Sequence, residues 1–444
     1  MKSTVSSGYT SIVYPTFREA FSFWVRLGFI SFGGPAGQIA IMHSELVERK
    51  KWISEVRFLH ALNYCMLLPG PEAQQLAIYV GWLLHRTWGG IVAGVFFVIP
   101  SIFILIGLSW AYVTFGTVPA IAAMFYGMKA AVVGIVVSAV IRIGQKALKN
   151  EVMFSLAAIA FIGLYFLKIP FPAIIISAGL IGLAGGSLWP KKFCVIKGQS
   201  NNAGKEVISD NQPPPEHTIP NWAWTVKVLA VSLSLWIIPL ILLALWRGQS
   251  DIFYKQGIFF SKAAMVTFGG AYSVLPYIAQ AAVGRYHWLR PDQMIDGLGL
   301  GETTPGPLIM VVAFIGYVGA WTKAVGLTPA VSGIIGGLIA TYFTFLPCFL
   351  WIFLGAPYIE QMRGNIKLTS ALSAITAAVV GVVLNLAVYF GRYVFFPETA
   401  PFDFRAFAIA AVAFVGLLKF DWDVIYVVLG GVGAGLLYKL LIAA

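Results

Sequence analysis

The amino-acid sequence predicts an all-α, polytopic transmembrane protein built from two inverted-topology repeats with broken or re-entrant helices. Three observations predict this fold class: an apolar composition, long stretches without charge, and rare motifs that recur at a fixed distance. Of 444 residues, 59% are hydrophobic and 11% are charged, whereas an average soluble domain has about 25% charged residues. A soluble chain of this length would form roughly three domains, and its polar residues do not suffice to cover them.

Eight stretches are nearly free of charge and define the expected spanning elements. They are 88–113, 118–140, 152–167, 171–187, 223–246, 326–354, 370–391 and 404–441. A helix needs ~20 apolar residues to cross a bilayer, so several stretches suffice for one crossing and the last suffices for two. A transmembrane barrel is excluded because it would show alternating segments of ~10 residues.

The chain contains an internal duplication. The FGG motif at 32–34 recurs at 268–270, and the PGP motif at 69–71 recurs at 305–307, both 236 positions later. Further along, Pro100 matches Pro347 and the AAVVG motif at 130–134 matches 377–381, both 247 positions later. We therefore predict a first repeat at 1–187, a second at 248–444, and one 11-residue insertion between 307 and 347 in the second.

Two segments separate the copies. Residues 188–222 are polar, carry several lysines and end near three consecutive prolines, which predicts a solvated cytoplasmic linker. Residues 223–247 form one further apolar segment without a partner in the first copy. A single extra crossing between two copies that each cross an even number of times would turn the second upside down, as in many secondary transporters.

The net charge of +12 indicates orientation rather than a nucleic-acid partner, because cytoplasmic loops of membrane proteins are rich in Lys and Arg. This rule places the N-terminus, Arg142, Lys146 and Lys149 in the cytoplasm and the C-terminus on the opposite side. The basic run 49–51 joins them only if the FGGP segment before it is re-entrant. The alternative is that the breaks interrupt full crossings, giving about thirteen spans.

Four glycine–proline interruptions predict the substrate site. Glycine tolerates positive φ and close backbone approach, and proline ends one helix and suits the first position of the next. Irregular backbone inside a membrane persists only where protein or a cavity surrounds it, and a helix N-terminus there favours an anion. The predicted binding residues are Gly33, Gly34, Pro35, Pro69, Gly70, Pro71, Gly269, Gly270, Thr303, Thr304, Pro305, Gly306 and Pro307.

Charged residues near the breaks supply further candidates. Glu72 and Glu302 are candidates for proton coupling, since intramembrane carboxyls commonly serve proton relay; capping of a helix N-terminus is the alternative for Glu72. Arg26 and Lys262 precede their FGG motifs by six residues and either attract an anion or snorkel to the interface. Lys129, on an apolar helix, is expected to pair with an acid.

At these residues the sequence resembles the chromate ion transporter family in its long, two-domain form. The resemblance runs from about 17 to about 440 and includes the FGGP and "LLPGPEA" segments of the first half and "GLGLGETTPGPL" of the second. It implies export of chromate, a sulfate-like tetrahedral dianion, across the inner membrane of a bacterium, energised by protons or membrane potential. The second copy departs from the first by reading FGGA, so the site is expected to be asymmetric.

The residues themselves favour secondary transport by alternating access. No nucleotide-binding motif of the G-x-x-x-x-G-K-[ST] type is present, and the three cysteines predict neither a metal site nor a disulfide framework. We expect no cofactor and no enzymatic activity. A sulfate or oxyanion uptake carrier and an anion channel remain alternatives, as does a membrane-bound reductase, which would require a redox cofactor. The chain could act alone or as a homodimer.

Overall fold

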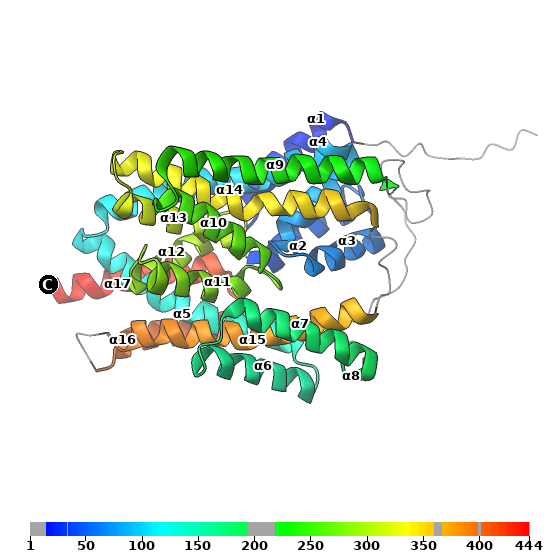
Figure 1. Cartoon of the computed structure of the whole chain (residues 1–444). Coiled ribbons are helices and arrows are strands. Elements are labelled where there is room, and N and C mark those ends of the chain that lie inside the picture. Colours follow the sequence, from blue (N-terminus) through cyan, green and yellow to red (C-terminus); the bar gives the residue numbers. More distant parts are fainter. Residues whose placement is uncertain are drawn as a thin grey trace, which may run out of the picture.

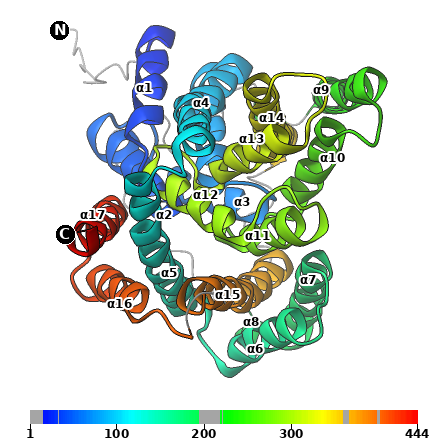
Figure 2. The same cartoon turned by 90° about the vertical axis from the view of Figure 1, so that its left-hand side faces the viewer.

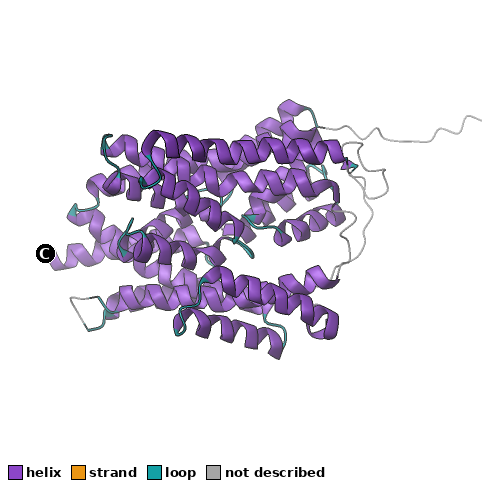
Figure 3. Cartoon of the chain, in the orientation of Figure 1, coloured by secondary structure: helices purple, strands orange, loops and turns teal. Residues whose placement is uncertain are grey.

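The computed structural model describes residues 15–32, 34–193, 218–219, 221–358, 366–397 and 401–443. Every regular element in these ranges is a helix (Figure 3). Within them, six helices are long and apolar enough to cross a membrane: Glu72–Phe115, Pro119–Ala147, Phe171–Leu188, Trp222–Arg247, Pro329–Tyr358 and Thr369–Phe395. The predicted all-α, polytopic class is therefore confirmed.

The first half of the chain contains a run of short helices followed by long ones. These are α1 (Phe17–Ile30), α2 (Gly34–His43), the π-helical turn η1 (Ser44–Arg49), α3 (Glu55–Leu67), α4 (Glu72–Phe115), α5 (Pro119–Ala147), α6 (Glu151–Tyr165), α7 (Phe171–Leu188) and α8 (Pro190–Phe193). Most of the predicted linker at 188–222 lies outside the described residues. The predicted connecting helix is α9 (Trp222–Arg247).

The second half repeats this order. Its elements are α10 (Ile252–Met265), α11 (Ala271–Ala279), the π-helical turn η3 (Gln280–Arg285), α12 (Pro291–Thr303), the 3₁₀ turn η4 (Leu308–Met310), α13 (Val311–Lys323), α14 (Pro329–Gly355), α15 (Ile366–Phe395), α16 (Phe404–Lys419) and α17 (Val424–Ala443). The turn η3 begins 236 positions after η1, and α12 begins 236 positions after α3. The helix boundaries therefore repeat at the same spacing as the sequence motifs.

The short helices that flank the breaks do not cross the molecule. Helices α1 to α3 occupy the right-hand half of Figure 1, and α10 to α12 occupy the left-hand half. The longest of these helices has 14 residues, about 21 Å at 1.5 Å per residue, which is less than the ~30 Å of a bilayer core. Each of these half-helices is therefore too short to cross a bilayer by itself.

The 11 extra residues of the second copy lengthen one helical hairpin. In the first copy, α4 folds back on itself at His85 and Arg86, where Arg86 has φ 53° and ψ −150°. In the second copy, residues 324–328 join α13 to α14. The same close glycine contact closes both hairpins, between Gly81 and the Gly89 carbonyl and between Gly316 and the Gly336 carbonyl.

Viewed end on, the half-helices α3, α11 and α12 lie between two groups of long helices (Figure 2). One group contains α4, α13 and α14, and the other contains α5 and α15 with their neighbours. The halves are interlocked in the second group, because α5 packs against α16 and α17 while α15 packs against α6 and α7.

The glycines of the AAVVG motifs allow α5 and α15 to pack closely against helices of the other half. A Cβ on Gly134 of α5 would lie 2.5 Å from the Ala410 carbonyl oxygen of α16, and one on Gly381 of α15 would lie 2.0 Å from the Ala157 carbonyl oxygen of α6. Small residues allow membrane helices to approach this closely. The motif therefore marks a packing contact between the two halves.

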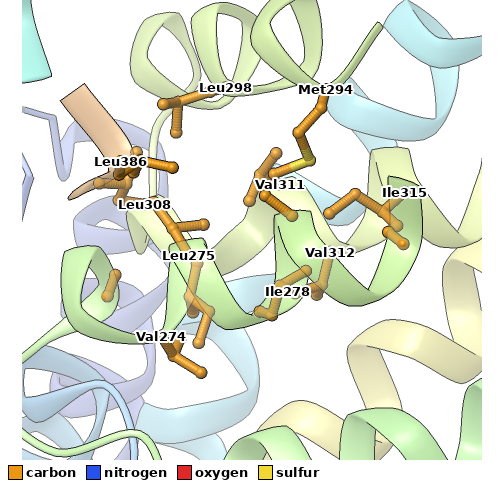
Figure 4. Close-up of a cluster of buried hydrophobic side chains, with 14 of the residues drawn as sticks. Val274, Leu275, Ile278, Met294, Leu298, Leu308, Val311, Val312, Ile315 and Leu386 are labelled. Carbon is orange, nitrogen blue, oxygen red and sulfur yellow. The ribbon is translucent and has the colours of Figure 1, made fainter. Parts of the chain in front are cut away.

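The second-copy half-helices enclose a continuous apolar core. Side chains of α11, α12, η4, α13 and α15 point toward one another there (Figure 4), and Val274, Leu298 and Leu386 are almost wholly buried. Close packing of apolar side chains is a main favourable contribution to the association of helices inside a membrane.

Candidate functional site

The four breaks meet through a reciprocal pair of backbone hydrogen bonds. The Gly70 amide donates to the Thr267 carbonyl at 2.7 Å, and the Gly306 amide donates to the Ser31 carbonyl at 2.6 Å. Each glycine belongs to a PGP motif, and each acceptor immediately precedes the FGG motif of the other copy. Ser31 and Thr267 are completely buried. The two copies are therefore joined at their interruptions, in the interior of the protein.

The long helices behind the breaks reinforce this junction at matching positions. Ser101 follows Pro100 in α4, and its hydroxyl donates to the Pro305 carbonyl. Cys348 follows Pro347 in α14, 247 positions later. A Cβ on Gly306 would lie 1.9 Å from Ser101 Oγ, and one on Gly70 would lie 2.8 Å from Cys348 Sγ.

Both PGP glycines also have positive φ, 132° at Gly70 and 93° at Gly306. Only glycine adopts such a backbone at little cost. Close approach and backbone conformation thus both require glycine here. The amides of these two glycines are already used in the reciprocal hydrogen bonds, so they are not free donors in this conformation.

The two candidate acids approach the second-copy FGG turn. Glu72 is the first residue of α4. Its Oε1 lies 3.0 Å from the position that a Cβ on Gly270 would take, and its Oε2 is buried without a hydrogen-bond partner. Glu302, near the end of α12, accepts a 2.5 Å hydrogen bond from the hydroxyl of Tyr272, two residues after Gly270.

The first-copy FGG turn has different surroundings. A Cβ on Gly34, which has φ 65°, would meet nothing within 4 Å, and the first turn of α2 contains no acid. The side chain of the buried Gln38 donates to the Gly306 carbonyl, while its Oε1 has no partner. The neighbouring Pro35 is half-buried, and Gly33 lies outside the described residues.

Several predicted residues have placements that narrow their roles. The prolines Pro69, Pro71, Pro305 and Pro307 are buried at the junction. Thr303 donates to the Leu300 carbonyl at 2.9 Å and Thr304 donates to the Gly301 carbonyl at 3.1 Å, so both hydroxyls bond back to their own helix. Arg26 and Lys262 are exposed on α1 and α10 and do not gather with the buried break residues.

Sequence reasoning missed three contributors to this junction: Ser101, Cys348 and Tyr272. The first two could have been found by extending the match between Pro100 and Pro347 by one residue. Tyr272 carries no repeat signal, because Ala36 occupies its position in the first copy. Its pairing with Glu302 depends on how α11 and α12 pack, which the motifs do not encode.

Comparison with known proteins identifies the family. A family model described as "Chromate transporter" matches residues 18–183 and again residues 254–436. The chain belongs to the chromate transporter family. The two matched segments begin 236 positions apart, in agreement with the motif spacing. Because this is a family of transport proteins, the expectation of a transporter rather than an enzyme is confirmed.

Individual relatives agree with this assignment. The chain is 29% identical over 427 residues to the chromate transport protein of Cupriavidus metallidurans, covering 94% of this chain and 92% of the relative. It is 30% identical over 391 residues to that of Pseudomonas aeruginosa, covering 86% and 83%. The shorter transporter YwrB of Bacillus subtilis, which is uncharacterised, is 34% identical over 159 residues, 34% of this chain and 79% of the relative. No solved structure matches the chain.

Proposed function

We propose that this protein exports chromate across the inner membrane by alternating access, coupled to protons or to the membrane potential. The observation that carries the proposal is the reciprocal hydrogen-bonded junction of the four breaks, which brings two oppositely directed sets of half-helices to one place. Paired interruptions in the two repeats of a transporter commonly form its substrate site near the middle of the membrane. The chromate transport proteins to which the chain is similar support the substrate.

We assign the oxyanion to the first-copy turn. Gly34, at the N-terminus of α2, has open space beside it, and the first turn of α2 contains no acid. Free amides at a helix N-terminus favour an anion, although Pro35 itself has no N–H to donate. At the second-copy turn, Glu72 and Glu302 stand where a dianion would otherwise approach. Two ionised carboxyls there would repel a dianion, at a cost that grows in a water-poor interior.

The second-copy turn then carries the coupling ion. Glu302 and Glu72 exchange protons with the two sides of the membrane. When both carboxyls are neutral, the junction tolerates a dianion at the first-copy turn; when they are ionised, they repel it. The Tyr272 hydroxyl donates a hydrogen bond to Glu302 and so orients its carboxyl group. The first-copy turn binds cargo and the second senses protons, so the two functions lie on opposite halves of one junction.

The orientation follows from exposed cations. The run Arg49, Lys50 and Lys51 is exposed beside the start of α3, on the right-hand side of Figure 1. Helix α5 returns to that side (Figure 1) and ends near Lys146 and Lys149. By the positive-inside rule this side is cytoplasmic, which puts the start of α1 in the cytoplasm and the end of α17 on the opposite side.

The conformation fits a state that is open to the cytoplasm. Ala40 of α2 and Asn63 and Met66 of α3 are exposed, although these half-helices reach the middle of the protein. The matching stretch of α12, residues 294–302, is buried throughout. Cargo would therefore reach the junction along α2 and α3 and leave along α11 and α12 after a rearrangement.

The decisive experiment is uptake of labelled chromate by inside-out vesicles that contain the protein, with and without a proton gradient and with excess sulfate. Export predicts accumulation that saturates, slows when the gradient is removed and is reduced by sulfate. Accumulation in right-side-out vesicles only, with sulfate preferred, would identify an uptake carrier for sulfate. Flux that neither saturates nor depends on any gradient would identify a channel.

A further inference from the structure

A second charged cluster lies apart from the junction, in the buried second-copy half of the protein. Asp296 of α12 has a side chain only 3% exposed, and Lys129 of α5 lies 3.8 Å from its Oδ2. The hydroxyl of Tyr112, at the end of α4, donates to the same oxygen at 2.9 Å. Charged side chains inside a membrane protein are costly and commonly mark an ion or substrate path.

Within this cluster, Asp296 is fixed and Lys129 is not. At 3.8 Å the lysine and the carboxylate attract each other without a hydrogen bond. Asp296 also accepts a hydrogen bond from Tyr112, which does not involve Lys129, and its Oδ1 is buried without a partner. Lys129 is 25% exposed along its side chain, so its ammonium group reaches space that Asp296 does not.

The cluster stands where the two helical groups close on each other. A Cβ on Gly299 of α12 would lie 2.8 Å from Cγ of Met128, the neighbour of Lys129. Tyr112 packs edge-on against Phe314 of α13, with ring centroids 5.1 Å apart. Opening the path along α12 would separate α12 from α5 here and would break the attraction between Lys129 and Asp296.

Asp292 is a second acid within electrostatic reach of Lys129. Arg290 and Asp292, at the start of α12, are joined to each other by two hydrogen bonds of 3.0 and 2.9 Å, so the carboxylate of Asp292 is already engaged. The residue that matches Asp296 in the first copy is His60, and the residue that matches Lys129 in the second copy is Thr376. The cluster therefore exists on one side of the protein only.

The geometry points to Lys129 as an oxyanion-binding residue of the exit path, with Asp296 as its counter-charge while that path is closed. When α12 moves away from α5, Asp296 stays with Tyr112 and the freed ammonium group binds the departing tetrahedral dianion. When the anion leaves, Lys129 returns to Asp296 and the path closes. This inference rests on the proposed function, because it assumes that an oxyanion crosses the protein.

The test compares Lys129→Gln with Asp296→Asn in inside-out vesicles supplied with labelled chromate. An exchange of partners predicts opposite effects. Lys129→Gln should lower chromate transport at least about tenfold, a loss equivalent to about 1.4 kcal/mol. Asp296→Asn should keep transport and lower the chromate concentration for half-saturation, because Lys129 no longer has to leave a carboxylate.

A merely structural ion pair predicts a different pattern, which would overturn the inference. Both single variants would then lose transport and thermal stability to a similar degree, and the double variant would regain them, since removing one partner of a buried pair costs more than removing both. Lys146→Gln is the matched control, because it removes an exposed cation from α5, the helix that carries Lys129, and it should transport as the wild type does.

A second measurement does not depend on comparing the stability of the variants, because its effect is reversible in one protein. It uses the contact between Met128 and Gly299. A disulfide formed between Met128→Cys and Gly299→Cys should stop chromate accumulation, and reductant should restore it. Full transport by the cross-linked protein would show that transport does not require α5 and α12 to separate, and it would refute the inference. Absence of accumulation by the wild type would instead refute the proposed export of chromate, so the two failures are distinguishable.

Discussion

The two FGG turns share one backbone plan but have opposite surroundings. The first-copy turn at Gly34 has open space beside it, and the helices α2 and α3 that flank it carry exposed residues. The second-copy turn at Gly270 is buried, faces Glu72 and lies two residues from the Tyr272 that binds Glu302. Duplication has therefore supplied a common scaffold, and single side chains have given its two halves different chemistry.

Neither acid has an acidic counterpart in the other copy. Leu308 stands at the position that matches Glu72, and Met66 stands at the position that matches Glu302. Both acids nevertheless reach the same turn, one from each half of the chain. A symmetric pair of proton sites is therefore absent from the junction, and the difference between the turns is the feature that experiments should challenge.

The largest effect is expected for Gly306→Ala, which disrupts the close packing of the PGP junction that both halves share. The new Cβ would lie 1.9 Å from Ser101 Oγ at a φ of 93°. Overpacking costs about 1–3 kcal/mol and the left-handed backbone a further ~1–2 kcal/mol, so the protein should lose thermal stability and transport together. Gly34→Ala is the control for thermal stability, because it adds the cost of the positive φ without a close contact. Equal stability of the two variants would show that the junction is not packed as described.

The second prediction tests whether Glu302 couples transport to protons without being required for chromate binding. Glu302→Gln should still bind chromate, but its transport should no longer respond to an imposed proton gradient, because the amide cannot exchange a proton. Tyr272→Phe is the matched control: it keeps the carboxyl group and should keep a response to the gradient. Vesicle flux of Glu302→Gln that follows the gradient as in the wild type would remove its coupling role.

The third prediction sharpens the comparison between the turns themselves. Gly34→Ala should raise the chromate concentration for half-saturation roughly tenfold, equivalent to about 1.4 kcal/mol, because the new methyl group would occupy the space that we assign to the anion. Gly270→Ala, with a comparable backbone cost, should change it much less. If Gly270→Ala raises that concentration as much as Gly34→Ala or more, the assignment of the anion to the first-copy turn is wrong.

The smallest effect is expected for Thr303→Val and Thr304→Val. Their hydroxyls bond to the Leu300 and Gly301 carbonyls of α12, so removing them should change stability by less than about 1 kcal/mol and leave the chromate dependence of transport unchanged. A selective loss of chromate affinity in either variant would return these hydroxyls to the binding site.

The sequence predicted the repeats, the breaks and the insertion because these depend on residue types at fixed spacing. Glycine with positive φ and proline at a helix start leave a local signature, and the two offsets located matching elements to the residue. The motif spacing also singled out Glu302, whose partner Tyr272 then appeared only in the structure.

What the sequence could not predict is which segments meet across the molecule. Three sets of contacts join residues that are far apart along the chain. They are the packing of α5 against α16 and α17 and of α15 against α6 and α7, the reciprocal hydrogen bonds of Gly70 and Gly306, and the pairing of Lys129 with Asp296. Lys129 was expected to pair with an acid, but only the packing of α12 against α5 selects Asp296. Such contacts depend on tertiary packing, which leaves no local periodicity to read.

An experimental structure with tungstate, an electron-dense tetrahedral dianion, would test the central claim most directly. The account predicts tungstate density within hydrogen-bonding distance of the backbone amides at the start of α2, with the reciprocal bonds from Gly70 to Thr267 and from Gly306 to Ser31 in place. Density at the second-copy turn beside Glu72 and Tyr272 instead, or PGP loops of the two halves that do not touch, would contradict it.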